Sequence, residues 1–232
     1  MAVHAIIFDI DGTLVDTNPS HVEAWRLAFN SAGYDVPTER IEAEIGKGGD
    51  LLVPAILGEE AEKRDGETLR KSQKNEFLKI AHSTRFRVFS CVPQVFEALR
   101  ERDVRTALAT SSDRKHLQAT CDSAGLDLPR LADVLVTKDD AGASKPEPDL
   151  VIVAVEKLGL TPGDCAMVGD TIYDARACCG AGVVFLGLES GGTPASELLE
   201  AGAAAVWRDP EHLFEDLEHA LEVASVAEAT SE

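Results

Sequence analysis

Six short apolar segments recur along the chain and alternate with amphipathic stretches. The apolar segments are Val3–Phe8, Val104–Ala109, Val134–Val136, Ala166–Val168, Val183–Leu188 and Ala204–Val206. Segments such as Val183–Leu188 are apolar throughout, as expected of strands in a parallel sheet that is covered on both faces. The stretches between them predict helices at Pro93–Arg102, Arg114–Ala124, Pro148–Leu158 and Ile172–Gly180. This alternation predicts an α/β fold with a doubly wound parallel sheet.

Residues 17–86 break the alternation, because no segment in that region reads as a strand. Asn18-Pro19 is a favourable helix start, with Asn18 as the N-cap and Pro19 at the first helical position. Further helices are predicted at Thr38–Ile45, Leu51–Leu57 and Glu60–Ala81. The sequence therefore predicts an α/β core domain of residues 1–16 and 87–232 with an inserted helical domain of residues 17–86. Hinges are expected near Val15–Thr17 and Thr84–Val88.

The formal net charge of −19 argues against nucleic-acid binding, which normally needs a basic surface. An anionic small molecule remains possible as a substrate, since a bound metal ion and one lysine reverse the field locally. No apolar run approaches the ~20 residues of a transmembrane helix, and no basic segment precedes an apolar one at the N-terminus. We therefore expect a cytoplasmic monomer or homodimer without nucleic-acid or membrane partners. The cysteines and histidines lack metal-ligand spacing, so zinc is not expected.

A pair of aspartates follows the first predicted strand. Asp9 and Asp11 are two residues apart, so both carboxylates face the same way if the backbone stays extended. Gly12 then allows a tight turn. Two carboxylates at one strand end repel each other and favour a bound cation, and oxygen ligands suit Mg²⁺. The sequence therefore predicts a magnesium site at the carboxyl edge of the sheet, where ligands of such folds bind.

Four segments resemble, in order, the four motifs of the haloacid dehalogenase-like phosphatases. They are Phe8–Asp16, Ala107–Ser112, Ser144–Asp149 and Val168–Asp174. The resemblance extends from Ile6 to about Gly187 and implies a Rossmann-like core whose helical insert acts as a cap over the site. It also implies a Mg²⁺-dependent phosphatase close to the phosphoglycolate phosphatases and β-phosphoglucomutases.

For the reaction, the resemblance implies that Asp9 attacks the phosphoryl group and forms a phospho-aspartyl intermediate. Asp11 would protonate the leaving alcohol and later take a proton from water. An anionic carboxylate must then approach an anionic phosphoryl group, and this repulsion has to be cancelled. Lys145 would neutralise both groups, and Thr110 would hydrogen-bond the phosphoryl oxygens.

For the metal, the implied ligands are Asp9, Asp170 and Asp11, the last through its backbone carbonyl. Asp174 lies four residues after Asp170, on the first turn of a predicted helix. It would support the metal through water or orient Lys145.

The insert carries two segments that favour different relatives. Ile45–Leu52 is similar to the glycine-rich cap segment of phosphoglycolate phosphatases, whereas His21–Trp25 resembles the first cap helix of β-phosphoglucomutase. The cap arginine with which those mutases hold a second phosphate has no clear counterpart, and Lys47 stands nearby. The residues expected to contact the substrate are Gly12, Ser111, His21 and Lys47.

These observations together predict hydrolysis of a small phosphorylated metabolite, such as phosphoglycolate or a sugar phosphate. The first alternative is a phosphomutase of the β-phosphoglucomutase type, which uses the same intermediate but depends on a bisphosphate primer. The second alternative is a catalytically silent regulatory protein that senses phosphate.

Overall fold

Six strands form one sheet at the centre of the protein, whose residues 3–226 are described by the computed structural model. In spatial order they are β5 (Val134–Val136), β4 (Arg105–Ala109), β1 (Ala5–Phe8), β6 (Cys165–Gly169), β7 (Val184–Leu188) and β8 (Ala205–Trp207). All neighbouring strands run parallel, so that Ile7 of the central strand lies between Ala107 and Met167. The predicted doubly wound parallel sheet is therefore confirmed.

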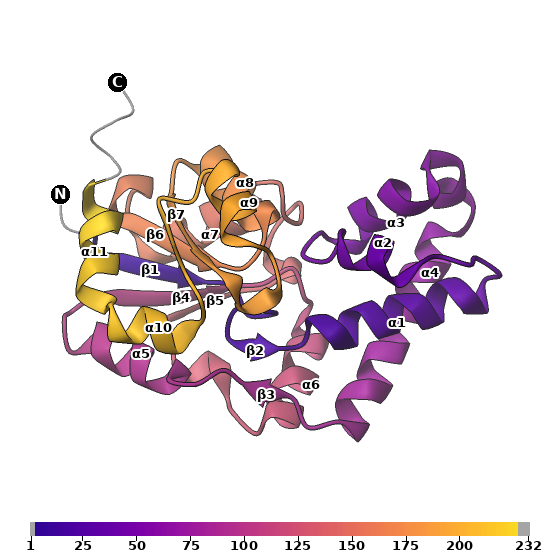
Figure 1. Cartoon of the computed structure of the whole chain (residues 1–232), viewed down its shortest axis with the longest axis horizontal. Helices are drawn as coiled ribbons and strands as arrows, with labels where there is room; N and C mark the ends of the chain where they lie inside the picture. Colours follow the sequence, from indigo (N-terminus) through magenta and orange to yellow (C-terminus); the bar gives the residue numbers. More distant parts are fainter. Residues whose placement is uncertain (1–2, 227–232) are drawn as a thin grey trace.

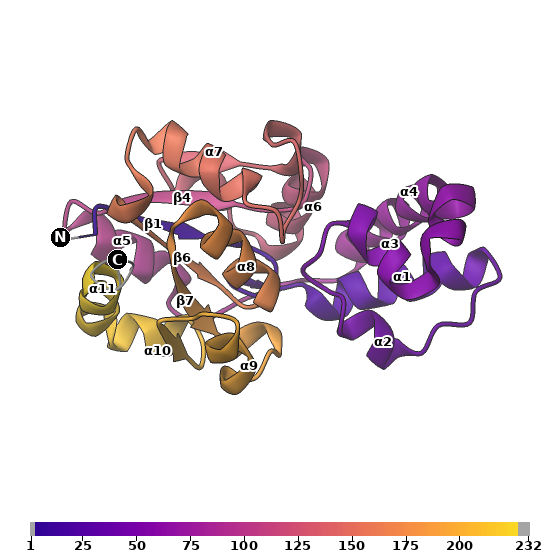
Figure 2. The same cartoon turned by 90° about the horizontal axis from the view of Figure 1, so that it is seen from above.

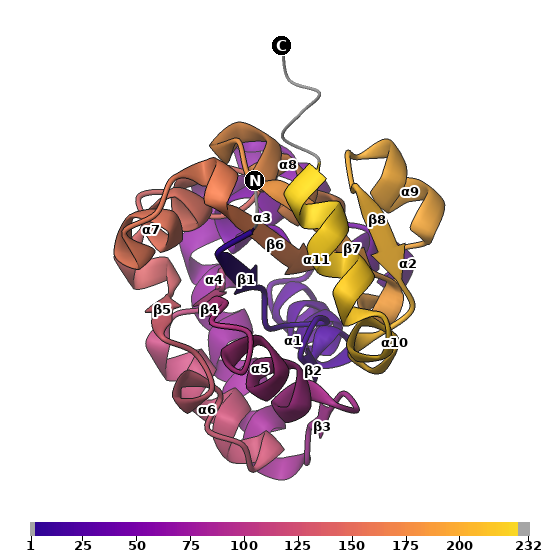
Figure 3. The same cartoon turned by 90° about the vertical axis from the view of Figure 1, so that its left-hand side faces the viewer.

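Helices cover both faces of this sheet, which Figure 3 shows as layers on either side of the strands. Ile6 and Phe8 pack on one face against α5 (Val92–Arg100), α6 (Arg114–Ala124), α10 (Pro210–Glu215) and α11 (Leu217–Val226). Ala5 and Ile7 point to the other face, against α7 (Asp149–Leu158), α8 (Ile172–Ala181) and α9 (Ala195–Glu200). Successive strand residues thus fill two different hydrophobic clusters, which explains why the strands are apolar throughout. Short 3-10 turns complete the core at η1 (Leu128–Arg130), η2 (Lys138–Asp140), η3 (Pro162–Asp164) and η4 (Glu189–Gly191).

Four inserted helices lie beyond the carboxyl ends of the strands (Figures 1 and 2). They are α1 (Asn18–Ser31), α2 (Thr38–Glu42), α3 (Gly49–Leu57) and α4 (Glu59–Ser83). These helices enclose their own hydrophobic cluster, in which Trp25 and Phe29 of α1 stack over a centroid distance of 5.4 Å. Within residues 3–226, every helix is too short or too polar to cross a bilayer.

Two short antiparallel strands connect this helical unit to the core. They are β2 (Val15–Asp16) and β3 (Arg87–Val88), with Val15 opposite Val88. An ion pair of 2.8 Å between Arg87 and Asp16 joins them on the outside. The two segments that connect the core to the inserted helices therefore lie side by side. They fall within the segments where the sequence predicts hinges.

The start of α1 differs from the prediction. Thr17 precedes the helix, so Asn18 is its first residue and not its N-cap. The helix start has no side-chain capping bond. The amide nitrogen of Asn18 donates to Asp170 Oδ2 and to the backbone oxygen of Gly191, both over 3.1 Å, so tertiary contacts orient this side chain.

Candidate active site

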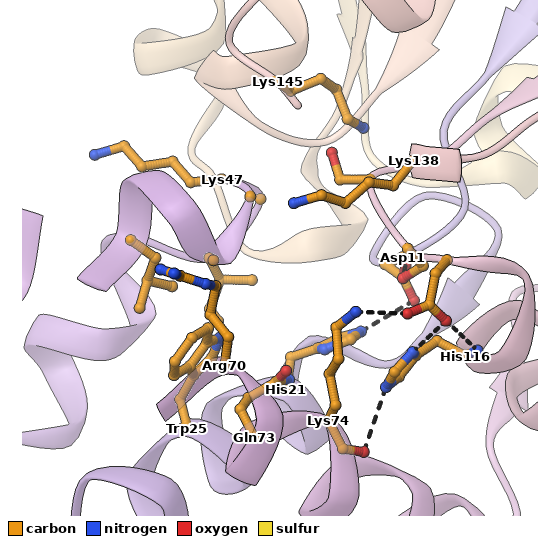
Figure 4. A pocket seen from close by; sticks show the side chains of 18 of the residues that line it. Asp11, His21, Trp25, Lys47, Arg70, Gln73, Lys74, His116, Lys138 and Lys145 are labelled. Atoms are coloured by element: carbon orange, nitrogen blue, oxygen red, sulfur yellow. Dashed lines mark hydrogen bonds and ion pairs between the residues drawn. The ribbon is translucent and has the colours of Figure 1, made fainter. Parts of the chain in front are cut away.

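The carboxyl ends of three strands bring the candidate catalytic groups to one edge of the sheet. Asp9 and Asp11 follow β1, Thr110 follows β4, and Asp170 is the first residue after β6. Lys145 comes from the loop before α7. Asp9, Asp11 and Lys145 line a cavity of about 120 Å³ between the core and the helical insert, which Figure 4 shows from close by. Residues from four distant parts of the sequence therefore meet at one site.

Lys145 is a buried cation shared by two buried carboxylates. Its Nζ donates one hydrogen bond to Asp9 Oδ1 and another, over 2.7 Å, to Asp174 Oδ1. Burial raises the pKa of Asp9 to about 7, although the charge of Lys145 opposes this shift. Burial would lower the pKa of Lys145, but the charges of Asp174 and Asp9 outweigh it and raise that pKa. The ammonium group therefore stays charged beside the candidate nucleophile.

Asp170, by contrast, accepts hydrogen bonds from two neutral donors. Thr13 Oγ1 donates to Oδ1 over 2.8 Å, and Asn18 Nδ2 donates to Oδ2 over 3.1 Å. No side-chain cation in residues 3–226 forms an ion pair with it. The carboxylate is fully buried, and burial followed by the charges of Asp174 and Asp9 raises its pKa well above the usual range. When ionised, the three carboxylates of Asp9, Asp170 and Asp174 outweigh the single ammonium group of Lys145 by two negative charges.

A divalent cation fits this gap in charge. Asp9, Asp170 and Asp174 offer carboxylate oxygens that lie within 4.8 Å of one another. Asp174 is less available, because Lys145 occupies its Oδ1 and the N–H and hydroxyl groups of Thr171 donate to its Oδ2. Asp9 and Asp170 therefore remain as the carboxylates that would hold Mg²⁺, a cation that prefers oxygen ligands.

Asp11 has a different environment, facing the cavity. Thr17 Oγ1 donates to Oδ1 over 2.6 Å, and Ser112 Oγ donates to Oδ2 over 3.1 Å. His21 Nε2 lies 3.3 Å from Oδ1 but is not aligned for a hydrogen bond. Burial would raise the pKa of Asp11, yet the charge of His21 and the donors around it outweigh burial and lower that pKa. Asp11 is therefore ionised in the free protein.

The hydroxyl groups after β4 are not equivalent. Thr110 Oγ1 is buried, accepts from the N–H of Ser112 over 3.0 Å and lies 3.5 Å from Asp11 Oδ2. Ser111 Oγ lines the cavity and, within residues 3–226, has no hydrogen-bond partner. The hydroxyl group of Ser111 thus faces the cavity, whereas that of Thr110, which the sequence motif favours, contacts Asp11 and the backbone of Ser112.

Comparison with known proteins identifies the family. The model of the haloacid dehalogenase-like hydrolases matches residues 3–182, which is more than three quarters of the chain. The chain belongs to the haloacid dehalogenase-like hydrolases.

Two curated relatives and one solved structure resemble this hydrolase over most of its length. It is 32% identical to a phosphorylated carbohydrates phosphatase of Thermotoga maritima, over 94% of this chain and 100% of that protein. It is 28% identical to a phosphoglycolate phosphatase of Nitrosospira multiformis, over 78% of this chain and 81% of that protein. A crystal structure of a hydrolase from Pseudomonas syringae has a TM-score of 0.85 and 29% identity, covering 93% and 98% of the two chains.

The helical insert of the hydrolase, called the cap from here on, supplies the opposite wall of the cavity. Figure 4 shows His21 and Trp25 from α1 together with Arg70, Gln73 and Lys74 from α4. His21 is held by stacking on the buried ring of Phe77, with a centroid distance of 4.1 Å. This stacking fixes His21 beside Asp11.

Two ion pairs cross from the cap to the core at the rim of this cavity. Lys74 of α4 contacts Asp113 over 2.6 Å, and Lys138 contacts Asp50 over 2.9 Å. Asp113 also accepts from the backbone and the ring of His116. Both pairs are partly exposed, so each contributes only about 0–1 kcal/mol to holding the cap against the core.

Two of the expected substrate contacts do not face the phosphoryl site. The ammonium group of Lys47 pairs with Glu44 and lies 4.9 Å from the ring centre of Tyr173, and Figure 4 shows it directed away from Lys145. Gly12 is packed behind Asp170 and does not line the cavity. His21, Ser111 and Lys47 therefore all line the cavity, with the ammonium group of Lys47 held by Glu44, whereas Gly12 is not among its lining residues.

Several cavity residues were not predicted from the sequence. They are Asn18 on α1, Arg70 and Gln73 on α4, and His116 and Lys138 in the core. A signal for the α4 residues existed, because Arg70, Gln73, Lys74 and Phe77 are spaced three, four and seven positions apart and so share one helix face. Polar side chains that share a helix face with a buried phenylalanine indicate that this face lines a ligand-binding site.

Proposed function

We propose that this hydrolase is a Mg²⁺-dependent phosphomonoesterase acting on a small phosphorylated metabolite. The observation that carries the proposal is the buried Lys145, which contacts Asp9 and Asp174, while Asp170 nearby has no cationic partner among residues 3–226. This arrangement suits an anionic nucleophile that must approach an anionic phosphoryl group. The names of the two curated relatives, both phosphatases, agree with it.

In the proposed reaction, one oxygen of Asp9 forms a bond to phosphorus while the bond between phosphorus and the leaving oxygen breaks. Lys145 offsets the charge of both groups, and Ser111 donates to a phosphoryl oxygen from its unpartnered hydroxyl. A bound Mg²⁺, held by Asp9 and Asp170, would neutralise the charge that develops on the phosphoryl oxygens. Water then attacks the phosphorus of the phospho-aspartate, releasing phosphate and restoring Asp9.

Asp11 is proposed to move the protons in both steps. Its lowered pKa means that it carries no proton before the substrate binds. The bound phosphoryl group adds negative charge next to Asp11, which raises the pKa of its carboxyl group and allows it to hold a proton for the leaving oxygen. After the alcohol has left, the carboxylate form accepts a proton from the attacking water.

The metal requirement gives the simplest test of this function. Protein stripped with a chelator and transferred to metal-free buffer is expected to hydrolyse p-nitrophenyl phosphate at least ~10³-fold more slowly, because a bound metal supplies several kcal/mol of charge stabilisation. Added Mg²⁺ should restore the rate. Full activity of the stripped protein would contradict the proposal.

The cap side of the cavity favours a substrate whose leaving group carries a second anionic group. Arg70 lines the cavity, and its Nη1 contacts both carboxylate oxygens of Glu62 over 2.6 and 2.8 Å. Gly66 lies between them on α4, and a Cβ there would fall 2.2 Å from Glu62 Oε2. The missing side chain thus lets Glu62 hold Arg70 in place, and the other N–H groups of Arg70 have no hydrogen-bond partner within residues 3–226.

Replacement of Arg70 by glutamine is expected to lower kcat/KM for phosphoglycolate by about 10- to 100-fold. This factor corresponds to the free energy that one hydrogen bond between charged groups contributes. Turnover of p-nitrophenyl phosphate, whose leaving group is neutral once protonated, should change little. Arg64→Gln on the exposed side of α4 is the matched control. An equal loss on both substrates would refute a role in recognising the second charge.

A further inference from the structure

Asn18 connects the metal-binding edge of the core to the first turn of the cap. It is the first residue of α1, yet its side chain points away from the helix and into the core. One Nδ2 group donates to Asp170 Oδ2 and to the carbonyl oxygen of Gly191, each over 3.1 Å. Both amide hydrogens are therefore used, one on a carboxylate after β6 and one on a loop after β7.

The surroundings are shaped for this contact. A Cβ at residue 12 would lie 2.3 Å from Asp170 Oδ2 and 2.4 Å from Asn18 Nδ2, and one at residue 191 would lie 1.6 Å from the same carboxylate oxygen. Glycine at both positions leaves a narrow slot in which the amide of Asn18 meets the carboxylate. Gly12 also has a φ of +82°, a backbone conformation that residues with a side chain rarely adopt.

The donors on Asp170 are chemically matched to a metal ligand. Thr13 holds Oδ1 and Asn18 holds Oδ2, and both donors are neutral. A neutral donor fixes the direction of a carboxylate without cancelling its charge, whereas a lysine or arginine at the same place would compete with a bound cation. Hydrogen bonds of this kind to metal ligands typically change metal affinity or activity by about 10- to 100-fold when they are removed.

Asn18 also stands at the boundary between two hollows. It lines the catalytic cavity and a second groove of about 750 Å³ that separates the cap from the core on the side of α2 and η4. The first turn of the cap therefore reaches across this boundary through the Asn18 side chain to the candidate metal ligand.

We propose that Asn18 is a positioning residue that orients Asp170 for Mg²⁺ and at the same time ties the first turn of the cap to the metal site. This inference rests on the proposed Mg²⁺-dependent function. The same amide group contacts Asp170, the candidate metal ligand, and fixes the start of α1 to the core at Gly191. Binding of Mg²⁺ and docking of the start of α1 therefore stabilise each other, because thermodynamic linkage makes such an effect reciprocal.

The test is a measurement of Mg²⁺ binding by titration calorimetry on the whole protein. Asn18→Ala and the near-isosteric Asn18→Leu are expected to raise the Kd for Mg²⁺ by about 10- to 100-fold. Asn30→Ala, on an exposed position of the same helix, is expected to bind Mg²⁺ like the wild type. The leucine variant keeps the volume of the side chain, and circular dichroism confirms that each variant is folded.

Hydrogen exchange supplies the second readout. Mg²⁺ should slow exchange of the amides in the first turn of α1 in the wild type, and it should not do so in either Asn18 variant. Unchanged Mg²⁺ affinity in both folded Asn18 variants would overturn the inference. A wild type that binds no Mg²⁺ at all would instead overturn the proposed function, so the two failures are distinguishable.

Discussion

Replacement of Asp9 by asparagine is expected to lower kcat for p-nitrophenyl phosphate by about 10⁴-fold or more, as loss of a covalent nucleophile does in other hydrolases. The amide oxygen is a poor nucleophile, so the phosphoryl group has no acceptor on the protein. The variant should still fold, because asparagine is close in size and Lys145 keeps its contact of 2.7 Å with Asp174. The measurement is steady-state release of p-nitrophenol with saturating Mg²⁺.

The same substitution carries an expectation for stability. Burial raises the pKa of Asp9 to about 7. Above that pH the ionised, buried carboxylate lowers the free energy of unfolding of the metal-free protein, and the variant lacks this carboxylate. The variant is therefore expected to unfold no more easily than the wild type in metal-free buffer at pH 8. Asp16→Asn is the matched control, since Asp16 lies on the same segment but pairs with Arg87 at the surface. Turnover that survives at the wild-type rate in folded Asp9→Asn would refute the nucleophile.

Replacement of Lys145 by methionine is expected to impair both stability and activity. It leaves Asp9 and Asp174 buried without their shared cation, and breaking a buried ion pair on one side costs about 3–5 kcal/mol. Loss of its contribution to charge stabilisation should lower kcat by at least about 10²- to 10³-fold. The free energy of unfolding from urea denaturation and the rate of p-nitrophenyl phosphate hydrolysis measure the two effects.

A surface lysine gives the comparison for this variant. Lys157 on α7 pairs with Asp140 over 2.9 Å but is partly exposed, and such pairs contribute about 0–1 kcal/mol. Lys157→Met should therefore leave stability and turnover nearly unchanged. If Lys145→Met were as stable and as active as Lys157→Met, the buried ammonium group would have no part in the site.

The sheet and the acidic edge could be predicted from the sequence because both follow from local pattern. Wholly apolar strands indicate a sheet that is covered on two faces. In a parallel sheet, the residues that follow the strands all lie at the same edge. That reasoning placed Asp9 and Asp170 at the same edge before any contact was known. The contact between Lys145 and Asp174 was one of two alternatives that the sequence left open.

The remaining features depend on side-chain direction, which the sequence pattern does not determine. Asn18 fits a helix N-cap by residue type, but it is the first residue of the helix, and its amide nitrogen donates to a carboxylate from another part of the chain. Lys47 looked free in a glycine-rich turn, although Glu44, three residues earlier, was available as a local partner. The spacing of Arg70, Gln73 and Phe77 places them on one face of α4, but it does not show that this face lies opposite the strand ends of the core.

The most direct test of the central claim is to trap the phosphoryl group on the protein. In Asp11→Asn, p-nitrophenyl phosphate should still phosphorylate the protein, because p-nitrophenolate leaves without a proton, whereas the water step lacks its base. Acid quenching followed by peptide mass spectrometry is predicted to find one added phosphoryl group, on the peptide segment that contains Asp9. A phosphoryl group on another residue, or phosphate release at the wild-type rate with an unmodified protein, would contradict the account.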